Sequence, residues 1–260
     1  MKINIAFNEK IPDYNETLKK VEQELDRYNV EYRSFDIANL QDFGDFTIVL
    51  GGDGTILRAA RFYSDFHIPV LGINMGRLGF LSHPDDVQEI ITSVIKGKYY
   101  IEDRLMLYSG IYLALNDFVI KGCNQSRSSK FCLEINDNVV CNYIADGIII
   151  STPTGSTAYG LSAGGPVLYP TLDSIVIVPI CPHTLNARPL VVPMTEKIAI
   201  KTSDMLLSVS IDGYDTIKCI DKITIEASEK KAKLAFLDNR KFYSTLRKSL
   251  HWGIPPKNIV

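Results

Sequence analysis

The spacing of apolar residues changes near residue 100, and this change restricts the fold more than any other feature. Before it, apolar residues recur every three or four positions over 14–28 and 87–95, which predicts amphipathic helices. Short apolar runs at 3–7, 46–50 and 70–73 have the length of buried strands. Beyond it, only short β-rich runs separated by turn signals follow. The sequence therefore predicts an α/β layer followed by an all-β layer.

We divide the chain at these changes of pattern. Residues 1–100 are expected to form an α/β domain with an open, Rossmann-like sheet, and residues 101–238 an all-β, sandwich-like domain. Residues 239–260 form a C-terminal tail that we expect to pack back on the N-terminal domain. Within the second domain, Asn136-Asp137-Asn138 predicts a hairpin turn because Asn and Asp tolerate positive φ.

The segment from Gly147 to Leu172 contains no Asp, Glu, Lys or Arg and is long enough to span a bilayer. However, it contains eight Gly and Pro residues, which neither a continuous helix nor a central strand tolerates. With no secretory signal in residues 1–25, we expect a cytoplasmic protein that is not in a membrane. The net charge of −2 argues against nucleic acid as a partner, and five cysteines without a CxxC pair argue against a stable metal site.

A glycine-rich turn, Gly51-Gly52-Asp53-Gly54-Thr55, joins the strand 46–50 to the next helix. Glycines let phosphate oxygens approach backbone N–H groups, and a helix N-terminus adds unpaired donors. A carboxylate beside phosphate is unfavourable unless it accepts a proton or holds a metal, so Asp53 indicates catalysis. The alternative is a tight turn with an Asp helix cap. Neither a P-loop nor a GxGxxG pattern is present.

Two further segments carry polar groups suited to a nucleotide. Thr152 to Pro166 reads TPTGSTAYGLSAGGP, in which hydroxyls and amides can bond to sugar and base edges and Tyr159 can stack on a planar ring. By composition alone, such a loop is more often only a connection. Asn116-Asp117 follows an apolar strand and, alone, indicates a turn.

Together these segments resemble the NAD kinases. The order is GGDGT, then Asn116-Asp117, then Asp146-Gly147 with the TPTGSTAYGLSAGGP segment. Residues 74–80 (NMGRLGF) and 181–190 (CPHTLNARPL) agree as well. GGDGT alone is also typical of lipid kinases, whereas the long Thr/Gly/Ser segment is specific.

The resemblance implies transfer of the terminal phosphate of ATP to the 2′-hydroxyl of the adenosine ribose of NAD, giving NADP. It assigns Asp53 as the general base. The phosphate-binding residues it implies are Gly51, Gly52, Gly54 and Thr55. The substrate-binding residues it implies are Asp53, Gly54, Arg58, Phe80, Asn116, Asp117, Arg127, Asp146, Thr157, Ala158, Tyr159, Gly160, Leu161, Ser162 and Tyr214.

The resemblance also implies partners. These are NAD, NADP and ATP, with Mg²⁺ accompanying ATP as the cofactor, and a homodimer or homotetramer formed through the β-rich domain. Three positions depart from common family residues: Asp117 stands where Glu is frequent, Ile144 where some relatives have Arg, and Tyr214 where Gln is frequent.

Two other functions stay open at this point. A lipid kinase of the diacylglycerol or sphingosine type would share the layout but act on a lipid alcohol. A non-catalytic NADP sensor would keep the pocket but would have no use for Asp53. The sequence leaves open whether inorganic polyphosphate can replace ATP, and whether NAD or NADH is preferred.

Overall fold

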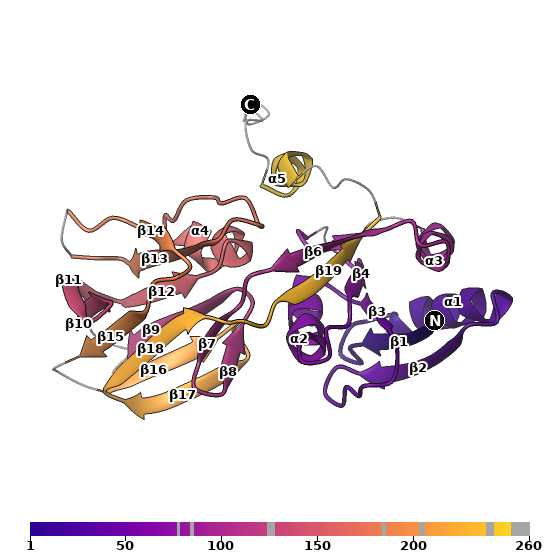
Figure 1. Cartoon of the computed structure of the whole chain (residues 1–260), viewed down its shortest axis with the longest axis horizontal. Helices are drawn as coiled ribbons and strands as arrows, with labels where there is room; N and C mark the ends of the chain where they lie inside the picture. Colours follow the sequence, from indigo (N-terminus) through magenta and orange to yellow (C-terminus); the bar gives the residue numbers. More distant parts are fainter. Residues whose placement is uncertain are drawn as a thin grey trace. The chain divides into compact units, whose positions relative to one another are not determined.

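The computed structural model describes residues 1–76, 79–83, 86–123, 128–183, 186–202, 206–237 and 242–250. The chain forms two compact units: the first combines Met1–Asp103 with Ala232–Val260, and the second is Arg104–Lys231. The sequence pattern placed residues 232–238 in the second domain, whereas strand β19 (Ala232–Phe236) joins the sheet of the first unit (Figure 1). No local pattern signals this return, because the pairing of β19 with β4 spans more than half of the chain.

The first unit is built on a seven-stranded sheet. Its order is β2-β1-β3-β4-β19-β6, with β5 beside β4, and the pairs of β1 with β2 and β3, and of β4 with β3, β5 and β19, are parallel. The bounds are β1 (Lys2–Phe7), β2 (Glu31–Asp36), β3 (Phe46–Leu50), β4 (Val70–Ile73), β5 (Ser82–His83) and β6 (Tyr100–Arg104). All five residues of β3 are buried, as expected for a central parallel strand.

Helices pack on this sheet. They are α1 (Tyr14–Arg27), α2 (Asp53–Ser64) and α3 (Val87–Ile95), and the first unit also contains α5 (Phe242–Leu250). The apolar faces of α1 and α3 form one core with Leu71 and Ile73 of β4, whereas Gly72 between them lies against Ile56 of α2. Since successive strand residues face opposite sides, α2 covers the other face of the sheet. The tail's described part is α5, in which the ring of Phe242 lies 6.4 Å from that of Phe80.

The second unit contains two six-stranded sheets, with orders β11-β10-β15-β18-β7-β8 and β14-β13-β12-β9-β16-β17. Their strands are β7 (Leu107–Ser109), β8 (Tyr112–Ala114), β9 (Asp117–Gly122), β10 (Ser129–Ile135), β11 (Asn138–Ala145), β12 (Gly147–Ser151), β13 (Ser174–Ile180), β14 (Leu190–Pro193), β15 (Ile198–Thr202), β16 (Leu207–Ile211), β17 (Asp215–Ile220) and β18 (Lys222–Ala227). Apolar side chains of both sheets form one buried core. The predicted open α/β layer and β-sandwich are thus confirmed.

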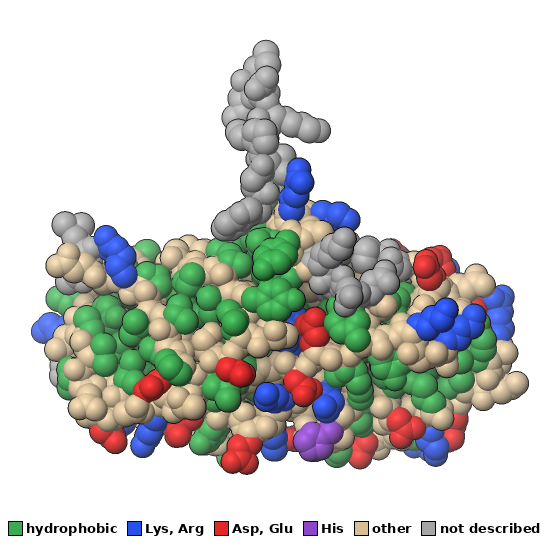
Figure 2. Space-filling view, turned by 45° about the horizontal axis from the view of Figure 1, so that its top comes forward, with side chains coloured by type: hydrophobic (Ala, Val, Ile, Leu, Met, Phe, Trp, Pro, Cys, Tyr) green, Lys and Arg blue, Asp and Glu red, His purple; other side chains and the backbone are tan. Residues whose placement is uncertain are grey.

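Local predictions in the second unit also hold. Asn136 and Asp137 have φ of 50° and 63° in the tight turn between β10 and β11, as the hairpin requires. The uncharged segment folds as β12, a 3₁₀ turn η1 (Thr154–Thr157) and a short helix α4 (Tyr159–Ser162). In the described parts of the chain, no helix has the length and apolar character needed to cross a bilayer. Figure 2 shows acidic and basic side chains interspersed on the visible face rather than gathered into one basic field.

Candidate functional site

The glycine-rich turn lies where β3 ends and α2 begins. Gly52 is the N-cap of α2 and Asp53 its first residue. The Thr55 and Ile56 N–H groups donate to the Gly52 carbonyl at 3.0 and 3.2 Å, so the Asp53 and Gly54 amides are the first-turn donors without an acceptor inside the helix. A Cβ built on Gly52 would have no described heavy atom within 4 Å, so the backbone here is open to a ligand. Gly51 differs, because its N–H already donates to the Ile73 carbonyl at 3.1 Å. Thr55 is buried, and its side chain fills the space beside Gly51, which leaves Gly52 to Gly54 as the open part of the turn.

The Asp53 carboxylate is held in place by a neighbouring loop. Its Oδ2 accepts the Phe80 N–H at 2.7 Å, and its Oδ1 accepts the Leu81 N–H at 3.0 Å. A Cβ on Gly79 would overlap this carboxylate, so only glycine permits the close approach. Arg58, one turn further along α2, is exposed. The carboxylate therefore has a fixed orientation at the start of α2.

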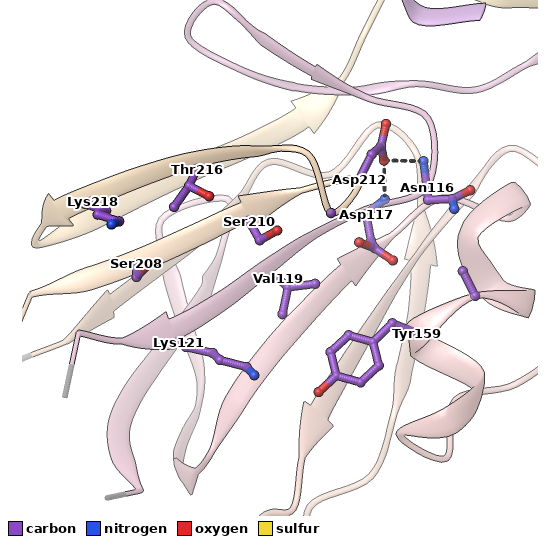
Figure 3. A pocket seen from close by; sticks show the side chains of 12 residues that line it. Asn116, Asp117, Val119, Lys121, Tyr159, Ser208, Ser210, Asp212, Thr216 and Lys218 are labelled. Carbon is purple, nitrogen blue, oxygen red and sulfur yellow. Dashed lines mark hydrogen bonds between the residues drawn. The ribbon is translucent and has the colours of Figure 1, made fainter. Parts of the chain in front are cut away.

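The second unit contains a cavity of about 540 Å³. Two residues of the predicted Thr/Gly/Ser segment, Ala158 and Tyr159, lie at one wall, and the floor comes from β9, β16 and β17 (Figure 3). The lining residues are Asn116, Asp117, Val119, Lys121, Ala158, Tyr159, Ser208, Ser210, Asp212, Gly213, Thr216 and Lys218.

Strand alternation determines which floor residues face the cavity. In β9, Phe118 and Ile120 point into the sandwich core, so Asp117, Val119 and Lys121 lie on the opposite face. In β16, Ser208 and Ser210 alternate in the same way with buried Val209 and Ile211. These floor residues were not predicted from the sequence, because their strands were expected to serve only as scaffold. Their only sequence signal is the polar half of an alternating pattern.

Two carboxylates lie at one end of the floor. Asp212 has φ of 47° in the turn between β16 and β17, and its carboxylate accepts the N–H groups of Leu115, Asn116 and Asp117 at 2.9, 2.7 and 3.0 Å. This network orients Asn116 and Asp117 towards the cavity. Tyr214 was among the predicted site residues, whereas Asp212, which holds Asn116 and Asp117 in place, was not.

The environment of Asp117 changes its acidity. Its side chain is 5% exposed, and burial, followed by the negative charge of Asp212, raises the pKa of the Asp117 carboxyl to about 7. Near neutral pH, a large share of Asp117 is therefore protonated and can donate as well as accept a hydrogen bond. Such a group suits the hydroxyls of a ribose.

The hydroxyls of the Thr/Gly/Ser segment act mainly within the protein. Thr152 Oγ1 donates to the Leu115 carbonyl at 2.6 Å and accepts the Gly155 N–H at 3.0 Å, while Ser151 Oγ donates to the Asn116 carbonyl at 3.1 Å. A Cβ on Gly155 would overlap the Asn116 carbonyl oxygen. The expected ligand-facing hydroxyls thus secure the loop against the chain just before β9, and only Ala158 and Tyr159 of this segment line the cavity.

The other predicted site residues lie elsewhere or outside the described chain. Asp146 is exposed between β11 and β12, Tyr214 is exposed beside Gly213, and neither lines the cavity. Arg127 lies outside the described residues. Thr157 ends η1, and Gly160, Leu161 and Ser162 belong to α4 without lining the cavity.

The described side chains include no group of three or more His, Cys, Asp or Glu placed to hold a metal ion. The Asp53 carboxylate oxygens already accept two amides. A divalent ion at this turn would therefore be held chiefly by phosphate oxygens of a nucleotide, the usual mode for Mg²⁺.

Comparison with known proteins gives a consistent result along the chain. Residues 6–99 match the family model of the ATP-NAD kinase N-terminal domain, and residues 115–237 that of the ATP-NAD kinase C-terminal domain. The NAD kinase of Magnetococcus marinus is 41% identical over 245 residues, covering 86% of this chain and 80% of that protein. The NAD kinase of Clostridium botulinum is 41% identical over 222 residues, covering 80% and 79%.

Solved structures agree in fold. An NAD kinase from Archaeoglobus fulgidus, crystallised in complex with ATP, superposes with a TM-score of 0.82 at 29% identity, covering 96% of this chain and 99% of that one. The yeast NADH kinase complexed with NADH gives a TM-score of 0.83 at 23% identity, covering 98% and 89%, which is a likeness of fold.

Proposed function

The chain belongs to the NAD kinase family, and we propose that Asp53 supplies its general base while the cavity on β9, β16 and β17 holds the dinucleotide. The activity of such an enzyme is phosphoryl transfer from ATP to NAD. In the proposed step, the Asp53 carboxylate takes the proton of the adenosine ribose 2′-hydroxyl. The hydroxyl oxygen then bonds to the γ-phosphorus, the bond from that phosphorus to the β–γ bridging oxygen breaks, and ADP leaves.

The observation that carries this proposal is the fixed Asp53 carboxylate beside open backbone. Two amide hydrogen bonds, of 2.7 and 3.0 Å, orient it, and the start of α2 offers N–H donors to phosphate. A structural cap would require neither the open Gly52 nor the close approach of Gly79. Each carboxylate oxygen keeps a second lone pair that can accept the hydroxyl proton.

The cavity of the second unit supports a dinucleotide by its chemistry. Asn116 and Asp117 provide hydrogen-bonding groups for ribose hydroxyls and base edges. The Tyr159 ring, with the residue 40% exposed, presents a face on which a planar base can stack. About 540 Å³ is within the usual range for small-molecule sites.

Mg²⁺ enters this proposal together with ATP, as part of the substrate. When bound it neutralises charge on the triphosphate. The glycine-rich turn has no P-loop lysine, so the amides at Gly52 to Gly54 and the α2 N-terminus are the groups that this chain offers to the phosphates.

We also propose a homodimer or homotetramer. The apolar side chains of Val139, Val140 and Ile144 are exposed on β11, which is an edge strand of its sheet. An exposed apolar edge favours pairing with another copy, and light scattering of the purified chain would measure the assembly. A cytoplasmic location is consistent with the free thiols of the described cysteines 123, 132, 141 and 181.

A labelled-phosphate assay tests the function and separates its rivals. ATP carrying a labelled γ-phosphate is supplied with Mg²⁺ and, in parallel reactions, NAD, NADH or a sphingoid or diacylglycerol alcohol. We expect label in NADP or NADPH and none in lipid. Label in lipid alone would favour the lipid kinase, and NADP binding without transfer would favour the sensor. Replacing ATP with polyphosphate in the same assay identifies the donor.

A further inference from the structure

The floor of the cavity has opposite charges at its two ends. In the strand register, Lys121 of β9 lies beside Ser208 of β16, and Ser208 lies beside Lys218 of β17. These three side chains therefore form one row across three strands. Figure 3 shows the row on the side of the cavity away from Asp117 and Asp212.

Neither lysine forms an ion pair with a described residue. Within the described chain, no carboxylate lies within ion-pair distance of either ammonium group, and Lys121 Nζ instead lies 5.9 Å from the centre of the Tyr159 ring. Adjacent strands are about 4.8 Å apart, so the two lysine stems are about 10 Å apart with Ser208 between them. Both ammonium groups can reach an anion above Ser208, whose hydroxyl adds a further donor.

We propose that Lys121, Ser208 and Lys218 form an anion subsite that binds the pyrophosphate of the dinucleotide. This inference rests on the proposed function, because it assumes that the dinucleotide occupies this cavity. The subsite adds phosphate recognition to the hydroxyl and base recognition at Asn116, Asp117 and Tyr159. None of its three residues belongs to the motifs that carry the family resemblance.

Spacing along the strands supports this assignment. From Asp117 to Lys121 the chain advances four residues, or about 13 Å. A ribose hydroxyl near Asp117 and a phosphate near the lysine row therefore fall within one extended dinucleotide, because lysine stems are long and flexible. The reverse placement would put phosphate beside the Asp212 carboxylate and the partly ionised Asp117, which is electrostatically unfavourable. The charge gradient thus sets the direction in which the ligand lies.

Binding measurements with ligand fragments test the subsite. Calorimetry compares NAD, ADP-ribose and adenosine on the full chain and on Lys121→Ala, Lys218→Ala and the double variant. Lys197→Ala is the matched control, because Lys197 is exposed just before β15 of the same unit and does not line the cavity. For the double variant we expect about 10- to 100-fold weaker binding of NAD and ADP-ribose, because hydrogen bonds from the two charged lysines to the pyrophosphate are lost. Adenosine affinity should change less than about twofold, since adenosine has no phosphate.

A second set of measurements separates recognition from packing. Lys121→Arg keeps the charge and should retain NAD affinity within about threefold. The NAD affinity of the unmodified chain should fall more steeply with salt than that of the double variant. In kinetics, the double variant should raise the KM for NAD and leave the KM for ATP unchanged.

The outcomes distinguish the subsite from the function on which it rests. Unchanged NAD affinity in the double variant, or an equal loss for adenosine, would overturn the anion subsite while leaving phosphoryl transfer intact. A raised KM for ATP alone would assign the lysines to the ATP phosphates and would also overturn it. Failure of the unmodified chain to bind NAD at all would contradict the proposed function and the subsite together.

Discussion

Two glycine-bearing segments of this molecule use the same residue for opposite reasons. At Gly52, a Cβ would meet no described atom within 4 Å, so the missing Cβ leaves the backbone accessible to a ligand. At Gly155, a Cβ would overlap the Asn116 carbonyl oxygen and lie 2.6 Å from Ser151 Oγ. There the missing Cβ lets two parts of the protein approach each other. A motif rich in glycine can thus mark either ligand contact or internal packing, and the two are separable only in three dimensions.

The same contrast applies to the polar residues of the two segments. In the turn at 51–55, the single carboxylate of Asp53 is a candidate reactive group. In the segment from Thr152, the hydroxyls mostly bond to backbone, and the groups facing the cavity come from other strands. Substitutions in the turn at 51–55 should therefore have large effects on the rate of NADP formation and small effects on stability. Substitutions in the segment from Thr152 should have large effects on stability and small effects on that rate.

Asp53→Asn should give the largest effect. Asn keeps an oxygen acceptor for the loop amides but cannot take a proton, so the rate of NADP formation should fall at least about 100-fold. Steady-state assays with Mg²⁺-ATP and NAD measure this loss. Thermal unfolding followed by circular dichroism is the control and should show a folded protein. A rate near that of the unmodified chain would remove Asp53 from the role of base.

Gly155→Ala should mainly affect stability. The added methyl group overlaps the Asn116 carbonyl, so the free energy of unfolding should fall by about 1–3 kcal/mol, typical of overpacking. Denaturant titration measures it. The KM for NAD should also rise, because Asn116 lines the cavity. A stability equal to that of the unmodified chain would show that the close contact is easily relieved.

Asp117→Asn should give a smaller, pH-dependent effect. The folded pKa of about 7 lies above the ordinary value of 3.8, so the folded state binds the extra proton between these values. Stability from this group is full below about pH 4 and is lost as pH rises through 7. The Asn variant lacks this loss, so relative to the unmodified chain it should gain on the order of 1 kcal/mol for each pH unit between pH 5 and pH 7. Thermal melts across this range measure it, and parallel pH profiles would contradict the burial effect.

Gly52→Ala should give the smallest change in stability. Its φ of −87° suits alanine, so the free energy of unfolding should be unchanged or rise by up to about 1 kcal/mol. The KM for ATP should increase if phosphate approaches this backbone. Measured beside Gly155→Ala, this variant tests whether the two glycines differ as their surroundings indicate. A large stability loss would contradict the open space at Gly52.

The sequence predicted the elements that depend on local pattern. Helical spacing located α1 and α3, an apolar run located β3, and the Asn136-Asp137 turn located a hairpin. The sequence did not predict which segments distant in the chain lie side by side. The insertion of β19 beside β4 and the use of Asp212 to orient Asn116 both depend on residues distant in the chain.

The cavity residues likewise divide into those that the sequence predicted and those that only the fold brings together. Asn116, Asp117 and Tyr159 were found because they belong to motifs. Lys121, Ser208 and Lys218 were not, because each is an ordinary polar residue in an alternating strand. Only the register of β9, β16 and β17 brings them into one row.

The position of β19 has a consequence for synthesis on the ribosome. It lies between β4 and β6 in the sheet order, yet it is made after all of residues 104–231. During synthesis, β4 and β6 therefore lack their shared neighbour β19 until the whole β-sandwich has been made and can fold. Because open strand edges attract other strands, the order of translation gives the second unit the opportunity to fold first. Completion of the sheet on which α2 packs is then a late event.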